Sequence, residues 1–158
     1  MTTTPSLSNA LQQEHQLITS LLDILKEEQD LLVNADTDSL AALTPRKSDL
    51  IQQLAASASQ RHQQLAAAGF PAEEAGMGAY LAAIQDEQAT RLWEELLEHT
   101  RAAKELNRVN GMLIGRQMAH NQTVIAAMKL AASDTDATTY GPSGQTSGAG
   151  PSKRFVVG

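Results

Sequence analysis

Residues 106–118 read LNRVNGMLIGRQM, and this stretch decides between two architectures. Its apolar side chains suit one face of a helix, yet Asn110-Gly111 is also a strong signal for a two-residue turn. A turn would create a further hairpin, but residues 112–114 are all apolar and offer no Ser, Thr or Asp to cap a new helix. The apolar stripe also keeps its phase across Gly111. The stretch therefore predicts one continuous helix over about residues 88–132.

Two Asn and two Gly residues are unusual in the interior of such a helix. Gly111 and Gly115 lie four residues apart, and each costs about 1 kcal/mol relative to alanine. Two explanations remain open, because the glycines either let another backbone approach closely or leave the helix easy to bend. Asn107 and Asn110, on a half-buried face, can fix the register of packing by hydrogen bonding, at some cost in stability.

The composition favours an all-helical protein. The 158 residues suit one domain, and 42% of them are apolar although only 3% are aromatic. A core of this kind, rich in Leu and Ala, is typical of helical bundles and coiled coils. The net charge of -6 argues against nucleic acid as a partner, because phosphate binding needs a basic face. The absence of cysteine excludes disulfides and thiolate chemistry and fits a reducing cytosol.

No targeting or membrane segment is apparent. The N-terminal residues MTTTPSLSNA lack the basic and apolar regions of a secretory signal. No apolar run approaches the length of a membrane span. We therefore expect a cytoplasmic protein without a membrane span.

Leucines and isoleucines spaced by seven residues predict a long amphipathic helix over about residues 7–33. The short NADTDS break at 34–39 makes the following helix its antiparallel neighbour. That second helix either begins at Thr44-Pro45 or begins earlier and kinks there, and Gly69 is expected just after its end. Charged residues share the apolar rows of both helices; these are Glu14, Glu28, Lys47 and Arg61.

The predicted fold class is all-α, an antiparallel bundle of three long helices with a short helical insert near 72–86. The bundle domain is expected to occupy residues 1–132. Residues 133–158 are rich in Gly, Ser, Thr and Pro, have no helical period, and are predicted to be a flexible tail that is disordered when free. Tyr140 lies in this tail, either by chance or because the segment docks on something and orders there.

The charges are distributed unevenly. Residues 1–45 hold seven acids and one base, whereas residues 106–132 hold Arg108, Arg116 and Lys129 and no acid. One interpretation is that complementary faces help the first and third long helices to pack antiparallel. The other is that the acid-free stretch meets an acidic partner.

The sequence offers no catalytic or metal-binding pattern. A di-iron bundle needs a Glu three residues before a His. The residues at that spacing here are Gln12, Ser59, Leu96 and Gln117. No nucleophile elbow, phosphate loop or zinc-protease motif is present. We therefore expect no enzyme activity, no metal and no cofactor.

The stretch LNRVNGMLIGRQM resembles the L-N-x-x-N-G-x-L-I motif of the FlgN-like flagellar export chaperones. The resemblance covers nearly the whole chain, and its most specific points are Asn107, Asn110, Gly111 and Tyr140-Gly141-Pro142. Pro45 and Tyr80 depart from the pattern and concern packing more than function. The resemblance implies a cytosolic chaperone that binds hook-associated (hook–filament junction) proteins and delivers them to the flagellar export machinery, with client recognition toward the C-terminus.

Residues 113–130 carry more apolar side chains than one core face requires. The predicted partner-binding residues are Leu113, Ile114, Met118, Val124, Ile125, Met128, Leu130, Ala131 and Tyr140. A chaperone of this kind is compatible with weak self-association. The alternative is a structural coiled-coil or bundle protein that uses this apolar excess to form a homo-oligomer. The periodicity alone does not separate the two.

Overall fold

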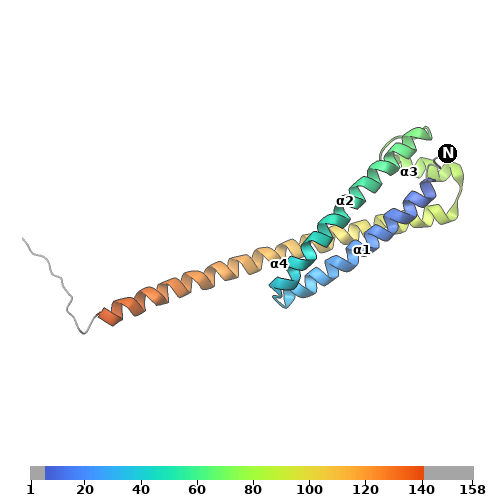
Figure 1. Ribbon diagram of the computed structural model, residues 1–158. Coiled ribbons are helices and arrows are strands. Elements are labelled where there is room, and N and C mark those ends of the chain that lie inside the picture. The colour runs from blue at the N-terminus through green and yellow to red at the C-terminus, as the bar shows by residue number, and fades with distance from the viewer. Residues whose placement is uncertain (1–5, 141–158) are drawn as a thin grey trace, which may run out of the picture. The chain divides into compact units, whose positions relative to one another are not determined.

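The computed structural model describes residues 6–140, with side chains described for residues 6–133. This part of the chain contains four helices and no strand (Figure 1). The helices are α1 (Leu7–Val33), α2 (Thr37–Ala67), α3 (Glu74–Ile84) and α4 (Glu87–Tyr140). The all-α prediction is confirmed. The chain forms two units, residues 1–114 and residues 115–158, so α4 belongs partly to each.

The start of α1 is capped by Ser6, whose Oγ accepts a hydrogen bond of 3.4 Å from the backbone N–H of Asn9. Such a cap satisfies one of the free N–H groups of the first turn. The predicted row of apolar residues is buried along the helix, and it consists of Leu11, Ile18, Leu25 and Leu32. The predicted bounds of 7–33 are confirmed.

Asp36 caps α2. Its Oδ1 accepts from the backbone N–H of Ser39 at 3.1 Å, and its Oδ2 accepts from the Ser39 hydroxyl at 2.8 Å. These two bonds lower the pKa of Asp36 from its ordinary value. Pro45 lies inside the helix, so the longer of the two predicted helices is confirmed. Gly69 follows the C-cap with a φ of 85°, as expected for the residue after a helix end.

The predicted insert is the single helix α3, which buries Met77 and Leu81. Its approach to the preceding loop requires a glycine at position 76, because a Cβ there would collide with the carbonyl oxygen of Pro71. The helix ends at Gln85, which has a left-handed backbone with a φ of 53°.

The third long helix begins where Asp86 accepts hydrogen bonds from the backbone N–H groups of Gln88 and Ala89, at 2.9 and 3.1 Å. It passes through Asn110-Gly111 without a break, so the prediction of one continuous helix is confirmed.

The predicted end of α4 is wrong, because the helix continues from residue 133 to Tyr140. Extending an existing helix costs far less than nucleating one, and Ser133 adds a bond of 3.0 Å from its hydroxyl to the carbonyl of Lys129. Residues 134–140 are therefore helical where disorder was predicted. The rest of the predicted tail, residues 141–158, lies outside the described residues, as does the side chain of Tyr140.

Two ion pairs show that α1 and α2 run antiparallel. Arg61 Nε contacts Glu14 Oε2 at 2.8 Å, and Lys47 Nζ contacts Glu28 Oε1 at 3.0 Å. Residue numbers rise along α1 while they fall along α2, and Figure 1 shows the two helices side by side.

The first half of α4 runs parallel to α1. His15 Nε2 lies 3.0 Å from Glu95 Oε2, and farther along both helices Asn110 Nδ2 lies 2.9 Å from the carbonyl oxygen of Leu25. The interpretation that the first and third long helices pack antiparallel is therefore wrong. The reason is that the chain reverses twice, once between α1 and α2 and once between α2 and α4, and two reversals return it to the direction of α1.

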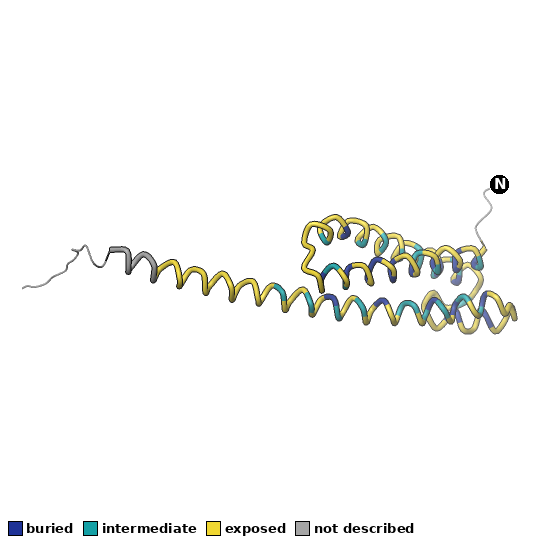
Figure 2. The backbone as a smooth tube through the Cα atoms, turned by 90° about the horizontal axis from the view of Figure 1, so that it is seen from below, coloured by how far each residue is buried: buried dark blue, intermediate teal, exposed yellow. Residues whose placement is uncertain are grey.

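The core of the first unit lies where α1, α2 and the first half of α4 face one another, and α3 covers one end. Figure 2 shows the buried positions on these facing sides. The core includes Leu11, Leu25, Leu65, Met77, Trp93 and Leu96. None of the described helices is long and apolar enough to cross a membrane.

Candidate functional site

Asn110 is fully buried at the meeting point of three helices. Its Nδ2 donates to the carbonyl oxygen of Leu25 and to Glu28 Oε1, both at 2.9 Å. Lys47 Nζ donates to the two oxygens of the same carboxylate, at 3.0 and 3.1 Å. Because Asn110 is on α4, Glu28 on α1 and Lys47 on α2, this network holds the three helices in one register. Asn107, the other motif asparagine, is exposed.

A second polar network lies at the other end of the first unit. Arg61 donates to Glu14 through Nε at 2.8 Å and through Nη2 at 3.1 Å, and it reaches Glu74 Oε1 at 3.2 Å. Its guanidinium also lies 4.8 Å from the centre of the Trp93 ring. Burial lowers the pKa of Arg61, but the hydrogen bonds and charges of Glu14 and Glu74 outweigh burial and raise that pKa above its ordinary value.

These networks explain the charged residues on the apolar rows. The sequence places Glu14, Glu28, Lys47 and Arg61 in those rows, but their pairing was not predicted. The signal was present, because charges at core spacing on two antiparallel neighbours must meet each other or remain unpaired. Both networks are structural, and among the described residues no group of three or more His, Asp or Glu side chains is placed to hold a metal ion.

The two helix glycines do not touch another backbone. A Cβ at Gly111 or Gly115 would meet no atom within 4 Å. The explanation by close backbone approach is therefore wrong for contacts within the described chain. Each glycine leaves open space on α4, and each lowers helix stability without a packing gain in the free protein.

Beyond the first unit, α4 presents exposed apolar side chains. Every residue from 118 to 133 is exposed. Four of these residues have large apolar side chains on one broad helix face, because they follow the three-, four- and seven-residue spacing. We name them the α4 apolar row; the exposed fractions are 58% for Met118, 36% for Val124, 52% for Ile125 and 66% for Met128.

The other predicted partner-binding residues with described side chains are not part of the α4 apolar row. Leu113 is half-buried and Ile114 is 41% exposed, and both belong to the first unit. Ala131 is exposed and follows Met128 by three residues. Leu130 is 70% exposed, but two residues along from Met128 corresponds to about 200° around a helix, so it projects from the opposite side.

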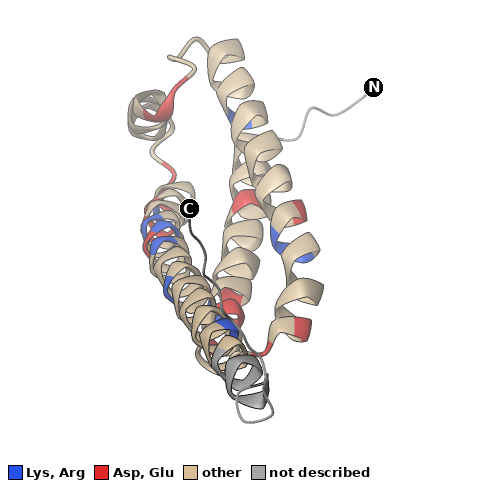
Figure 3. Cartoon of the chain, turned by 90° about the vertical axis from the view of Figure 1, so that its left-hand side faces the viewer, with Lys and Arg blue, Asp and Glu red and all other residues tan. Residues whose placement is uncertain are grey.

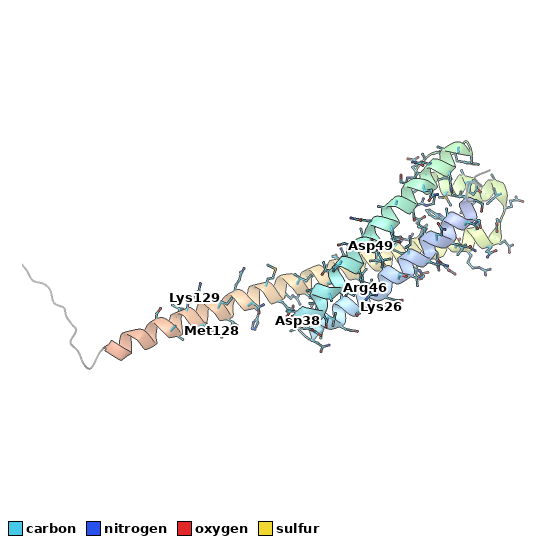
Figure 4. All side chains as sticks on the ribbon, viewed as in Figure 1. Lys26, Asp38, Arg46, Asp49, Met128 and Lys129 are labelled. Carbon is cyan, nitrogen blue, oxygen red and sulfur yellow. The ribbon has the colours of Figure 1, made fainter. Side chains whose placement is uncertain are left out.

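The charge around the α4 apolar row is positive. Arg116 and Lys129 have no ion pair among the described residues, and no acid occurs between residues 106 and 132. Figure 4 shows Met128 and Lys129 extending from α4 in different directions. By contrast, Figure 3 marks the positions of acidic residues on α1 and α2 in red. The second unit thus offers an apolar row with basic neighbours, which suits an apolar and acidic partner surface.

One comparison with known proteins gives a match. The model of a protein family, described as FlgN protein, matches residues 1–148 and so covers all four helices. No curated protein matches the chain, and no solved structure matches it.

Proposed function

Because the chain belongs to the FlgN family, a family of flagellar assembly chaperones, we propose that it binds hook-associated (hook–filament junction) proteins in the cytosol and delivers them to the export machinery. The choice of hook-associated proteins as clients is supported by the resemblance of LNRVNGMLIGRQM to the family motif. The exposed apolar surface of α4 supports binding to a helical client. The chaperone would cover helical segments of the client that otherwise assemble or aggregate too early.

The α4 apolar row is the observation that carries the proposal. Met118, Ile125 and Met128 each expose more than half of their surface. Burying such a side chain contributes roughly 1.5–3 kcal/mol, so a partner helix that covers the row gains substantial free energy. Methionine is flexible and polarisable, and it adapts to client helices of different shape.

The register of the row fits a helix-in-groove or helix-on-helix contact. Such contacts use anchors separated by three, four and seven residues. Met118 and Ile125 are seven apart, and Met128 and Ala131 continue the same face. Lys129 follows Met128 by one residue and lies beside this face, so acidic residues beside the apolar face of the client would add attraction that salt weakens.

A double variant of the row tests the proposal. We expect Ile125→Ala with Met128→Ala to weaken binding of a purified hook-associated protein by roughly ten- to a hundredfold, measured by titration calorimetry. Thermal unfolding should stay nearly unchanged, because both side chains are exposed in the free protein.

Leu130→Ala is the matched control, because it removes an equally exposed apolar side chain from the opposite side of the same helix. The affinity of the Leu130→Ala variant for the hook-associated protein should stay close to that of the native protein. If the double variant folds normally and binds as tightly as Leu130→Ala, the α4 apolar row is not the client surface.

The homo-oligomer alternative uses the same exposed side chains. It predicts that the free protein sediments as a stable oligomer at micromolar concentration and that Ile125→Ala with Met128→Ala converts it to a monomer. The chaperone proposal predicts at most weak self-association, with a client complex that forms from the monomer.

A further inference from the structure

A long groove runs along the first unit between α2 and α4. One part of it has a volume of about 230 Å³ and a floor formed by Ile18, Leu21 and Leu25 of α1. An adjoining part has a volume of about 470 Å³ and reaches Trp93 and Arg61. Both parts are lined by Ile18, Leu54, Thr100 and Lys104, so they form one continuous feature. We name it the α2–α4 groove.

The walls of the groove are apolar and follow helical spacing. On α2, Ile51 is 47% exposed, and Leu54 and Ala58 continue its row as half-buried residues. On α4, Leu97 is half-buried and Ala103 is buried. The wall from residue 47 to residue 61 is roughly 20 Å long at 1.5 Å per residue, which matches three to four turns of an added helix.

The rim of the groove is basic. Lys47 is bonded to Glu28, and Arg61 is bonded to both Glu14 and Glu74, which are the acids that line the groove. Arg101 and Lys104 on the α4 side are exposed and have no ion pair within the described part of the chain. Their positive charges therefore face solvent beside the apolar α2–α4 groove.

We propose that the α2–α4 groove binds one amphipathic helix of a partner protein, with its apolar face inward and Asp or Glu residues along the edge that meets Arg101 and Lys104. The bound helix would complete a four-helix arrangement around the apolar floor of α1. This site shares no residue with the α4 apolar row, so it is a second surface and does not depend on the proposed client contact.

The charge argument also disfavours a second copy of this chain as occupant. The exposed apolar helix that such a copy offers is residues 115–133, which carries Arg116 and Lys129 and no acid before residue 134. Two like charges would then face Arg101 and Lys104, and like charges brought together at an interface oppose binding.

A pair of designed peptides tests the charge and the apolar match together. Both are helical peptides of about 18 residues with Leu at three- and four-residue spacing; one carries Glu along one edge, and the other carries Lys. Trp93 is the single tryptophan and lines the groove beside Arg61, so its fluorescence reports occupancy. We expect the Glu peptide to bind at least tenfold more tightly than the Lys peptide, with a difference that shrinks at high salt.

Variants locate the site. Arg101→Glu with Lys104→Glu should reverse the peptide preference, whereas Arg91→Glu, a matched change outside the groove on the same helix, should leave it unchanged. Ile51→Ala should lower the affinity for the Glu peptide about five- to tenfold. The variant should stay folded, because the side chain of Ile51 is half exposed. The double variant Ile125→Ala with Met128→Ala should bind the Glu peptide as the native protein does.

Two results would overturn the proposal. One is equal binding of the two peptides, or a preference that survives Arg101→Glu with Lys104→Glu in a normally folded variant. The other is a dimer of the free protein that Ile51→Ala dissociates, because a second copy would then fill the groove.

Discussion

Replacing Asn110 by alanine should destabilise the first unit far more than any exposed change in the same motif. The substitution removes a hydrogen bond to the Glu28 carboxylate and one to the carbonyl oxygen of Leu25, both 2.9 Å long and fully buried. The bond to the charged group contributes roughly 1.5–3 kcal/mol and the other roughly 0.5–1.5 kcal/mol. The higher helix propensity of alanine offsets up to about 0.7 kcal/mol of this loss in the free energy of unfolding. The expected net loss is about 2–4 kcal/mol in the free energy of unfolding.

The assay is urea unfolding followed by the fluorescence of Trp93, which reports on the first unit alone because it is the only tryptophan and lies in that unit's core. A loss of this size corresponds to a melting temperature lower by about 8–16 °C, at about 4 °C per kcal/mol for a domain of this length. Asn107→Ala is the matched control, because Asn107 is exposed on the same helix, and its effect should stay within about 0.5 kcal/mol.

A second substitution tests the charge of the network. Asn110→Asp keeps the shape of the side chain but places a carboxylate beside Glu28 in a buried site, where like charges repel strongly. The loss of stability should therefore be larger at pH 7 than at pH 4, relative to the native protein. An Asn110→Ala variant as stable as Asn107→Ala would refute the claim that this residue joins the helices.

Three further outcomes follow from the structure. Gly111→Ala and Gly115→Ala should each raise the free energy of unfolding by about 1 kcal/mol in thermal melts followed by circular dichroism, because an added Cβ meets open space; a loss would contradict the open space at these positions. Arg61→Ala should cost about 3–5 kcal/mol in urea unfolding because it leaves the buried carboxylate of Glu14 unpaired, and adding Glu14→Gln should recover part of that loss. The stabilisation that comes from the charge of Asp36 should be fully present above its ordinary pKa of 3.8 and be lost as the pH falls through its lower folded pKa, so the destabilisation by Asp36→Ala in thermal melts should be larger at pH 7 than in strong acid.

Local signals predicted much of the fold. The bounds of α1, the break at residues 34–39 and the glycine after α2 are short-range features, and each depends on a few neighbouring residues. The path of α4 through Asn110-Gly111 was also predictable, because a turn there lacked a following cap. Such elements follow from capping and periodicity, which the sequence records directly.

Relations between distant elements were harder to predict. The direction of α4 relative to α1 follows from two reversals of the chain, and the interpretation of complementary charges on the two helices did not take the second reversal into account. The end of α4 was placed too early because Ser, Asp and Thr usually favour caps and turns, although they can extend a helix that has already formed. The α2–α4 groove arises only when three helices pack, so no single periodicity indicates it.

The continuity of α4 across the two units has a kinetic consequence. A helix needs a costly nucleus, and the first unit supplies that nucleus by holding the helix up to Ile114. The segment beyond it can therefore fray from its C-terminal end and rewind turn by turn, on a timescale of about 0.1–1 μs. This segment can therefore unwind and re-form while the first unit stays folded. Under the proposed chaperone function, capture and discharge of a client at this segment would need no slow refolding step.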